Sequence, residues 1–271
     1  MSYADEVTAS LNGVELADAV PAALVVSVAR QLAGERRHVF VDVPGRSGSY
    51  LFPEQPGDRS LRLELDLQAS TFDERRAAVR DLAGWADLTG SARLILSDEP
   101  DRYHDAILDD RPELLEQLVY AASSIVFRVG PYALAITPTT VALAVSGAGS
   151  DSGTFTGTET GGVDAFPVVE ITPNDGTLTS FAWTLNGTEI SYGDTVAMGD
   201  TITISSISDT VTLGASGDTD LTGAFVAGLV AMATVSGDFG RVLPDSNDWA
   251  FEWTGTATDI TIDLTWRERF R

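Results

Sequence analysis

The first half of the chain shows two periods of hydrophobic residues, one after the other. In residues 60–69 (SLRLELDLQA) leucine alternates with polar residues, and this period of two predicts a strand with one buried face. Residues 71–88 change to helical spacing, and Thr71 with Glu74 has the pattern of a capping box. The sequence therefore predicts a long strand followed directly by a helix.

Short alternating runs predict further strands on both sides of this pair. They span residues 36–43, 91–97, 102–110 and 123–130. Residues 98–101 (DEPD) predict a turn between two of them. The apolar run at 20–34 fits either a helix or a buried strand. Together these elements predict an α+β N-terminal domain that is rich in strands and has one packed helix.

The second half of the chain has the pattern of strands alone. Its strand-like runs cover residues 166–171, 179–185, 200–206, 209–214, 249–255 and 259–270. Asn186-Gly187, between two runs, is the signal of a tight hairpin. Short strands separated by turn residues predict an all-β sandwich.

Small polar residues fill the stretch between the two halves. Residues 146–162 (SGAGSDSGTFTGTETGG) contain one large apolar residue, Phe155. This composition is typical of a flexible arm or a long loop. We therefore expect an N-terminal domain over 1–140, a linker or arm over 141–165, and the sandwich over 166–271.

Charge and composition exclude several classes of protein. The 271 residues include 40 acids and 17 bases, and the formal net charge is −23. Such a surface disfavours nucleic-acid phosphates and anionic membranes. The chain has no cysteine, and residues 1–20 lack the pattern of a signal peptide. We expect neither a disulfide framework nor a secreted or membrane protein.

Candidates for catalysis or metal binding are weak throughout the sequence. His38 and His104 each lie in a strand-like run without an obvious partner, and we expect surface or hydrogen-bonding roles for them. The acids at 98–101 and 109–110 fit turns, and the stretch 214–223 lacks the ligand spacing of an EF-hand loop. The sequence therefore predicts no enzyme, no cofactor and no metal.

Three tryptophans of the second half leave two interpretations open. Trp183, Trp249 and Trp253 occur at a period of two with Phe181 and Phe251, which is typical of a sandwich core. Exposed tryptophans on a sandwich can instead stack on sugar rings or on a partner protein. The three tryptophans are therefore candidates for contacts made by the sandwich, and core packing is the competing interpretation.

Residues 43–52 (VPGRSGSYLF), with the segments that follow, resemble the distal tail protein (Dit) family of long-tailed phages. The other similar segments, in the family's order, are FDERRAAVRDLAGWADLTG at 72–90, ARLILSDEPDRYHDAIL at 92–108, GVDAFPVVEI at 162–171, DTITISSISDTVTL at 200–213 and DITIDLTWRERF at 259–270. The resemblance covers about residues 36–271 and depends on the order and spacing of these segments.

This resemblance implies a structural protein of the virion. The first domain would form a ring, usually a hexamer, that stacks on the tail tube and meets the tail-associated hub protein. A galectin-like or carbohydrate-module-like sandwich would project outward, to carry receptor-binding proteins or touch a host surface glycan. DNA would pass through the ring without specific binding. The protein would be assembled in the host cytoplasm and reside at the tail tip.

Residues 43–67 supply the candidates for contacts between subunits. Hairpins and strand edges offer backbone hydrogen bonds, and arginine adds charge-assisted ones to a neighbour's acids. We expect Arg46 to form an ion pair across the contact between two subunits, and Tyr50 to pack at the same contact. Arg59 and Arg62 lie in the same segment. An internal hairpin, with Arg46 on a local carboxylate, is the competing interpretation.

A carbohydrate-binding β-sandwich adhesion module without catalytic activity is the alternative function. The missing signal-peptide pattern weighs against a secreted lectin, and the predicted helix between strands at 60–97 weighs against a lone sandwich. The outer domain of a tail hub could also bind glycans, so the two functions are compatible.

Overall fold

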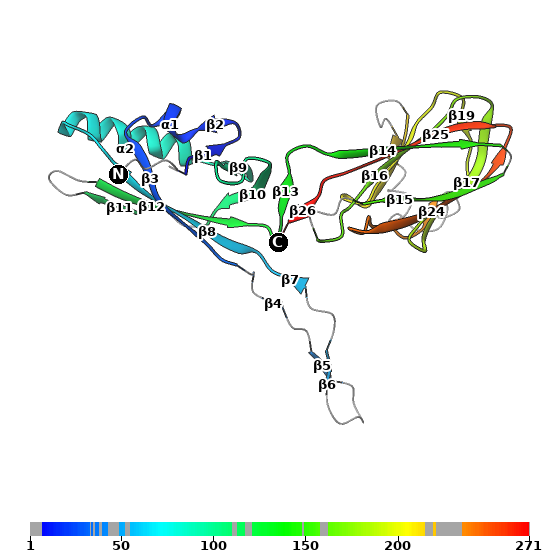
Figure 1. The fold of residues 1–271 in the computed structure, drawn as a ribbon, viewed down its shortest axis with the longest axis horizontal. Coiled ribbons are helices and arrows are strands. Elements are labelled where there is room, and N and C mark those ends of the chain that lie inside the picture. The colour runs from blue at the N-terminus through cyan, green and yellow to red at the C-terminus, as the bar shows by residue number, and fades with distance from the viewer. Residues whose placement is uncertain are drawn as a thin grey trace. The chain divides into compact units, whose positions relative to one another are not determined.

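The computed structural model describes residues 7–32, 34, 36–37, 40–42, 49–51, 55–109, 113–116, 121–147, 149–157, 162–214, 219–220 and 235–270. The chain is mostly β-structure, with three large antiparallel sheets and few helices (Figure 1). It forms two compact units, and the boundary between them lies at Ile136 and Thr137.

The N-terminal unit is built on one antiparallel sheet of strand order β2-β1-β9-β10-β12-β8-β3, with β11 beside β12 and β13 beside β10. The strands are β1 (Ala9–Leu11), β2 (Val14–Glu15), β3 (Ala23–Arg30), β8 (Arg59–Leu67), β9 (Ala92–Leu96), β10 (Arg102–Leu108), β11 (Glu113–Glu116), β12 (Ala121–Val129) and β13 (Ala133–Ala135). Two short pairs, β4 (Arg36–Arg37) with β7 (Gln55–Pro56) and β5 (Phe40–Asp42) with β6 (Ser49–Leu51), lie outside this sheet. The ambiguous run at 20–34 therefore contains a strand, β3.

The strand β8 and the helix α2 (Phe72–Ala86) build the core of this unit. The leucines of β8 alternate with exposed or half-buried residues, and none of the four is more than 2% exposed. Leu82 and Trp85 of α2 belong to the same buried cluster, and Figure 1 shows the helix lying along the sheet. A short helix, α1 (Leu16–Ala19), contributes Leu16. The predicted strand–helix pair is confirmed.

The predicted capping box at the start of α2 is also confirmed. The Thr71 hydroxyl accepts a hydrogen bond from the Glu74 N–H at 3.2 Å, and the Glu74 carboxylate accepts from the Thr71 N–H at 3.1 Å. We expect Thr71→Ala to lower the free energy of unfolding of the N-terminal unit by about 1 kcal/mol, because one helix N–H loses its partner. Denaturant unfolding measures the change. Thr71→Ser, which keeps the hydroxyl, is the control and should cost clearly less.

Two six-stranded sheets form the C-terminal unit, with orders β14-β25-β16-β20-β21-β22 and β15-β24-β17-β18-β23, the latter with β19 beside β17. Their strands are β14 (Thr139–Ser146), β15 (Ser150–Thr156), β16 (Val168–Pro173), β17 (Thr177–Leu185), β18 (Thr188–Tyr192), β19 (Val196–Ala197), β20 (Ile202–Ser205), β21 (Thr210–Leu213), β22 (Thr219–Asp220), β23 (Val235–Gly237), β24 (Ser246–Gly255) and β25 (Asp259–Trp266), with β26 (Arg269–Phe270) after them. Buried residues of both sheets, such as Ile262 and Phe251, share one hydrophobic core. The unit is therefore a sandwich.

The predicted linker over 141–165 is wrong for most of its described residues. β14 pairs with β25, and β15 pairs with β24, along the whole lengths of β14 and β15. Both lie in antiparallel sheets that pack one face on the core, so one apolar face is enough, and Leu143, Val145 and Phe155 supply it. The backbone hydrogen bonds of a strand do not require apolar side chains. Residues 158–161 lie outside the described part of the chain.

Two tight turns place Asn-Gly pairs in the left-handed region. The predicted hairpin turn between β17 and β18 is confirmed, with φ of 51° at Asn186 and 78° at Gly187. Asn12-Gly13, with φ of 50° and 82°, makes the equivalent turn between β1 and β2. Positive φ at both central residues defines the type I′ turn that suits the twist of a two-residue hairpin.

Candidate functional site

The tryptophan candidates lie in the core of the C-terminal unit. Trp183, Trp249 and Trp253 are 2%, 8% and 5% exposed. Trp183 stacks on Trp249 with ring centroids 6.1 Å apart, and the Trp253 indole N–H donates to the Ala257 carbonyl at 3.1 Å. A sugar or partner platform made of these rings is therefore wrong, because the period of two places them on the inner face of their sheet. The competing interpretation, core packing, is confirmed.

The four interface candidates differ in what the structure describes. Arg46 lies outside the described residues, and Tyr50 is described through the backbone pairing of β6 with Val41 of β5. Arg59 and Arg62 both lie in β8, but residues three apart in a strand face opposite sides of the sheet. Arg59 is half-buried on the core side, and Arg62 is exposed on the other. These two arginines therefore cannot contribute to the same face of the sheet.

Arg59 belongs to a polar cluster at one end of the main sheet of the N-terminal unit. Strand register brings the cluster together: Arg59 lies opposite Val129, Val129 lies opposite Ala106, and His104 precedes Ala106 on the same face. The members of the polar cluster come from β3, β8, β10 and the turn between β9 and β10, and they are Arg30, Arg59, Asp98, Glu99, Asp101, Arg102 and His104.

Two of the three arginines of the polar cluster contact carboxylates. Arg30 Nη2 donates to both oxygens of Asp98, at 2.7 Å and 2.5 Å. Arg102 Nη1 lies 3.5 Å from Glu99 Oε1. Arg59 differs, because its Nε and Nη2 are buried and have no hydrogen-bond partner. A buried donor without a partner costs about 1–3 kcal/mol, and more when it is charged.

Burial also shifts the protonation equilibria of the polar cluster. It lowers the pKa of Arg59, which remains protonated at neutral pH as arginines do. Burial is the main cause that lowers the pKa of His104 from 6.5 to about 4, and Arg59, Arg30 and Arg102 add to the shift. His104 is 7% exposed, and its Nδ1 has no hydrogen-bond partner. Of the two roles expected for His104, the surface one is therefore wrong, and the imidazole is neutral at pH 7.

We expect His104 to make the N-terminal unit less stable in acid. Its folded pKa of about 4 lies below the unfolded value of 6.5, so the unfolded chain binds more protons between these values. The free energy of unfolding therefore falls as the pH falls through this window. From pH 7 to pH 5 the wild type should lose about 2 kcal/mol more than His104→Gln, which does not titrate there. Urea unfolding at several pH values measures both slopes, and equal slopes would contradict a buried neutral imidazole.

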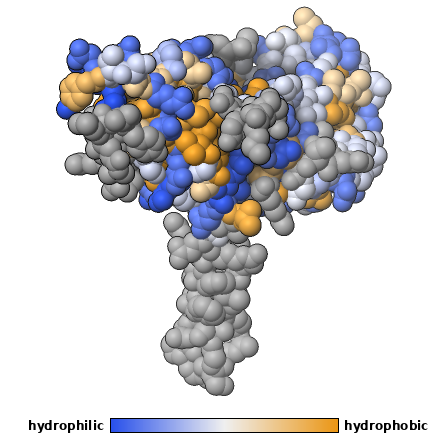
Figure 2. Space-filling model, turned by 60° about the vertical axis from the view of Figure 1, so that its left-hand side comes forward, coloured by the Kyte–Doolittle hydropathy of each residue, from blue (hydrophilic) through white to orange (hydrophobic). Residues whose placement is uncertain are grey.

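Two open hollows lie away from the polar cluster. One, of about 530 Å³, lies beside α2 and is mostly apolar, with Val79, Leu82 and Leu108 among its lining residues. Figure 2 shows apolar residues gathered on a face of the N-terminal unit. The other hollow, of about 550 Å³, lies over β17, β18 and β24 and is lined in part by Ser180 and Glu252. Both of these hollows are large enough for a ligand or a partner's side chains.

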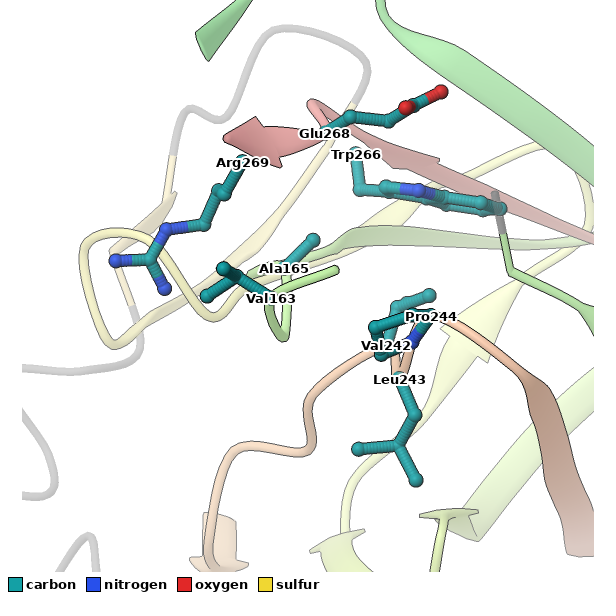
Figure 3. A pocket seen from close by; sticks show the side chains of 8 residues that line it. All are labelled: Val163, Ala165, Val242, Leu243, Pro244, Trp266, Glu268 and Arg269. Atoms are coloured by element: carbon teal, nitrogen blue, oxygen red, sulfur yellow. The ribbon is translucent and has the colours of Figure 1, made fainter. Parts of the chain in front are cut away.

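A third hollow, in the C-terminal unit, is too small for an organic ligand. Figure 3 shows its lining residues, which come from the segments 163–165 and 242–244 and from the end of the chain around Trp266 and Arg269. Its volume is about 10 Å³, which is room for one water molecule at most. This place is a packing feature of the sandwich.

Metal and membrane sites find no support in the described part of the chain. Among these residues, no three histidine, aspartate or glutamate side chains come together as metal ligands would. No described helix is both long enough and apolar enough to cross a membrane.

Comparisons with known proteins find similarity in part of the sequence and in the fold. Residues 26–128 match the family described as "Phage tail protein RIFT-related domain". The crystal structure of Dit (gp 19.1) of phage SPP1 matches with a TM-score of 0.68 and 16% identity, over 98% of this chain and 100% of that chain. The phage P2 baseplate, in its activated conformation with Ca, matches with a TM-score of 0.39 and 10% identity, over 95% and 97%. No curated protein sequence matches the chain.

The resemblance expected from the sequence is thereby confirmed. The structural match covers the fold of both units, while the sequence match is confined to the N-terminal one. Residues 26–128 include every member of the polar cluster and both arginines of β8. The part of the chain with a recognisable family sequence is therefore also the part in which two nitrogens of Arg59 are buried without a hydrogen bond.

Proposed function

We propose that this chain, which carries a phage tail protein RIFT-related domain and has a Dit-like fold, is a distal tail protein, a structural hub component of a phage tail. The observation that carries the proposal is the structural match, which leaves almost no part of either chain unmatched. Fold by itself does not imply function. The sequence match over residues 26–128 adds independent support.

The N-terminal unit is the proposed ring-forming part. A closed ring repeats one head-to-tail contact around its axis, so each subunit needs two different adhesive surfaces. Strand β3 suits one of them, because it is an edge strand in the described sheet, has no acidic residue, and exposes Val26 by 61%. Proteins usually protect such an edge with charges or bulges, and β3 has one bulge, at Val26 in its pairing with β8. A homo-oligomer, a hexamer by analogy with the family, would cover it.

The ring would join the tail tube protein to the tail-associated hub protein at the tail tip. DNA would pass through it without specific binding, because a chain of net charge −23 offers little attraction for phosphates. This function requires neither an active site nor a cofactor, which agrees with a family of tail proteins rather than of enzymes. Assembly would take place in the host cytoplasm.

The C-terminal sandwich, of galectin-like or carbohydrate-module-like type, is the proposed outward-facing part. It would carry receptor-binding proteins or touch a host glycan. The hollow over β17, β18 and β24 favours carbohydrate binding as a second candidate function, because Ser180, Ser191, Thr254 and Glu252 line it with hydroxyl and carboxylate groups. These groups can hydrogen-bond to sugar hydroxyls. Screening the full chain on a glycan array tests this candidate, and an array without any hit would contradict it.

The test of the hub function is the mass and shape of the purified protein. Light scattering at low and at multimolar salt, with negative-stain images, should show a ring of about six subunits with a central hole. Salt matters because it screens the repulsion between chains of charge −23. Antibodies raised against the protein should label the tail tip of intact phages. Label elsewhere on the virion, or none, would overturn the proposal.

A further inference from the structure

We propose that Asn12 is a site of spontaneous covalent modification, where the side-chain amide is lost as ammonia through a succinimide, and that the structure protects Asn186 from the same reaction. Both asparagines lie in the sequence Leu-Asn-Gly, at 11–13 and at 185–187. A glycine after the asparagine favours the reaction, because it has no side chain to obstruct its own nitrogen. Since the two sequences are identical, the folded structure decides which of them reacts.

The reaction needs no partner other than water. The backbone nitrogen of Gly13 forms a bond to Cγ of Asn12, and the bond between Cγ and Nδ2 breaks. Nδ2 leaves as ammonia and takes with it the proton that the Gly13 nitrogen loses. Water then opens the five-membered ring at one of its two carbonyls. The product is an aspartate or an isoaspartate, and in isoaspartate the main chain runs through the former side chain.

The side chain of Asn12 is well placed for this reaction. Its Oδ1 accepts a hydrogen bond from the Arg93 N–H at 2.8 Å, so a donor already faces the oxygen on which negative charge develops as Gly13 attacks. Both Asn12 and Gly13 are exposed. Within the described part of the chain, no group accepts a hydrogen bond from Asn12 Nδ2. The leaving nitrogen is therefore open to water.

The ring can close only when the turn between β1 and β2 opens. In a type I′ turn the Gly13 nitrogen points away from the Asn12 side chain, and rotation about the Cα–C bond of Asn12 has to bring it round. Strand β2 lies at the end of the described sheet, has two exposed residues, and pairs with β1 at these two positions. The Trp85 indole N–H adds one hydrogen bond, to the Val14 carbonyl at 3.1 Å. Such a short edge segment opens at a much lower free energy than the whole unit unfolds.

Asn186 is held much more firmly than Asn12. Its Nδ2 donates to the Arg241 carbonyl at 2.9 Å and to Asn247 Oδ1 at 2.7 Å, and Asn247 is fully buried. Its Oδ1 accepts from the Asp248 N–H at 3.0 Å. Strands β17 and β18 pair at five positions, against two for β1 and β2. Attack at Asn186 would have to break these contacts and free a leaving group that two acceptors hold.

Asp175-Gly176 could form the same succinimide and is protected in another way. The ring closes on the neutral acid, because an ionised carboxylate is a poor target for a nucleophile. The Thr258 hydroxyl donates to Asp175 Oδ2 at 2.6 Å, and the N–H groups of Thr258 and Asp259 donate to Oδ1, both at 2.8 Å. These hydrogen bonds, that of the hydroxyl first, lower the pKa of Asp175 and keep it ionised at neutral pH. Asp175 is therefore a second internal control.

Incubation of the full chain in buffered H₂¹⁸O for several weeks tests the inference without reference to the proposed tail function. Peptide mass spectrometry follows the ¹⁸O that each ring opening takes from water. In the folded protein we expect Asn12 to convert at least about tenfold faster than Asn186, and Asp175 to stay unlabelled. In guanidinium chloride the two asparagines should convert within about twofold of each other, because neither hairpin is stable by itself.

Trp85→Phe tests whether the release of β2 limits the reaction. Phenylalanine keeps an aromatic ring in the core but removes the hydrogen bond to Val14. The rate at Asn12 should rise by about threefold or more, and the rate at Asn186 should not change. Equal rates at the two asparagines of the folded wild type would overturn the inference. An Asn12 that stays intact while the unfolded chain converts would overturn it as well.

Discussion

Trp183→Ala is expected to lower the free energy of unfolding of the C-terminal unit by about 4 kcal/mol. The indole is 2% exposed and stacks on Trp249, and Phe181 and Leu185 flank it on the same face of β17. Removing it leaves a cavity between two sheets that cannot collapse, because each is held by its own ladder of hydrogen bonds. The mechanism is a loss of packing, so an outward-facing contact plays no part in it.

Guanidinium unfolding followed by far-ultraviolet circular dichroism measures this change without depending on tryptophan fluorescence. Ile207→Ala is the matched control, because Ile207 is 66% exposed in the same unit and should cost less than about 0.5 kcal/mol. A Trp183→Ala protein as stable as this control would show that the indole lies at the surface. The candidate role of Trp183 in sugar or partner contacts would then return.

Asn247→Ala is expected to cost the same unit about 3 kcal/mol, through polar groups rather than packing. Asn247 is fully buried, and its side chain makes four hydrogen bonds. Its Oδ1 accepts from the Leu243 N–H and from Asn186 Nδ2, both at 2.7 Å. Its Nδ2 donates to the carbonyls of Leu243 and Asp245, both at 3.0 Å. Alanine would remove the partner of the Leu243 N–H and of the Leu243 carbonyl, while the Asp245 carbonyl would keep its hydrogen bond from the Gly157 N–H.

Asn174→Ala provides the control for this second experiment. The Asn174 amide also bonds to side chains, at Asp259 and Thr261, but the residue is exposed, so water can replace the lost contacts. Asn174→Ala should lower the free energy of unfolding by less than about 1 kcal/mol in the same assay. Equal losses of stability at the two positions would mean that water replaces the hydrogen bonds of Asn247, and the expected cost of burying unpaired groups there would be wrong.

Elements with a clear local pattern were predictable from the sequence. The alternation of β8, the helical spacing of α2 and the Thr71–Glu74 capping box depend on residues close together in the chain. Asn186-Gly187 is equally local, because the two residues alone favour the positive φ of the turn. The strands β14 and β15 were missed, since small polar residues dominate them and long-range pairing with β25 and β24 holds them in place.

The candidate site shows the same difference between local features, which the sequence predicts, and long-range contacts, which it does not. That Arg59 and Arg62 face opposite sides of a strand can be read from their spacing. The environment of Arg59 could not be read in this way, because the polar cluster draws on three strands and a turn whose register is set by long-range pairing. The period of two placed Trp183 on one face of its strand, but it did not show whether that face is buried in the core or exposed to solvent. Partners across the sandwich decide this.

The pairing of Thr139 with Trp266 has a consequence for how this kind of protein can diversify. These residues are the first of β14 and the last of β25, so the chain enters and leaves the sandwich at adjacent positions, about 5 Å apart as paired strand residues are. A unit whose two ends are adjacent can be exchanged for another with the same spacing of ends without stretching the chain. Recombination could therefore replace the C-terminal unit of such a protein while the N-terminal unit keeps its sequence.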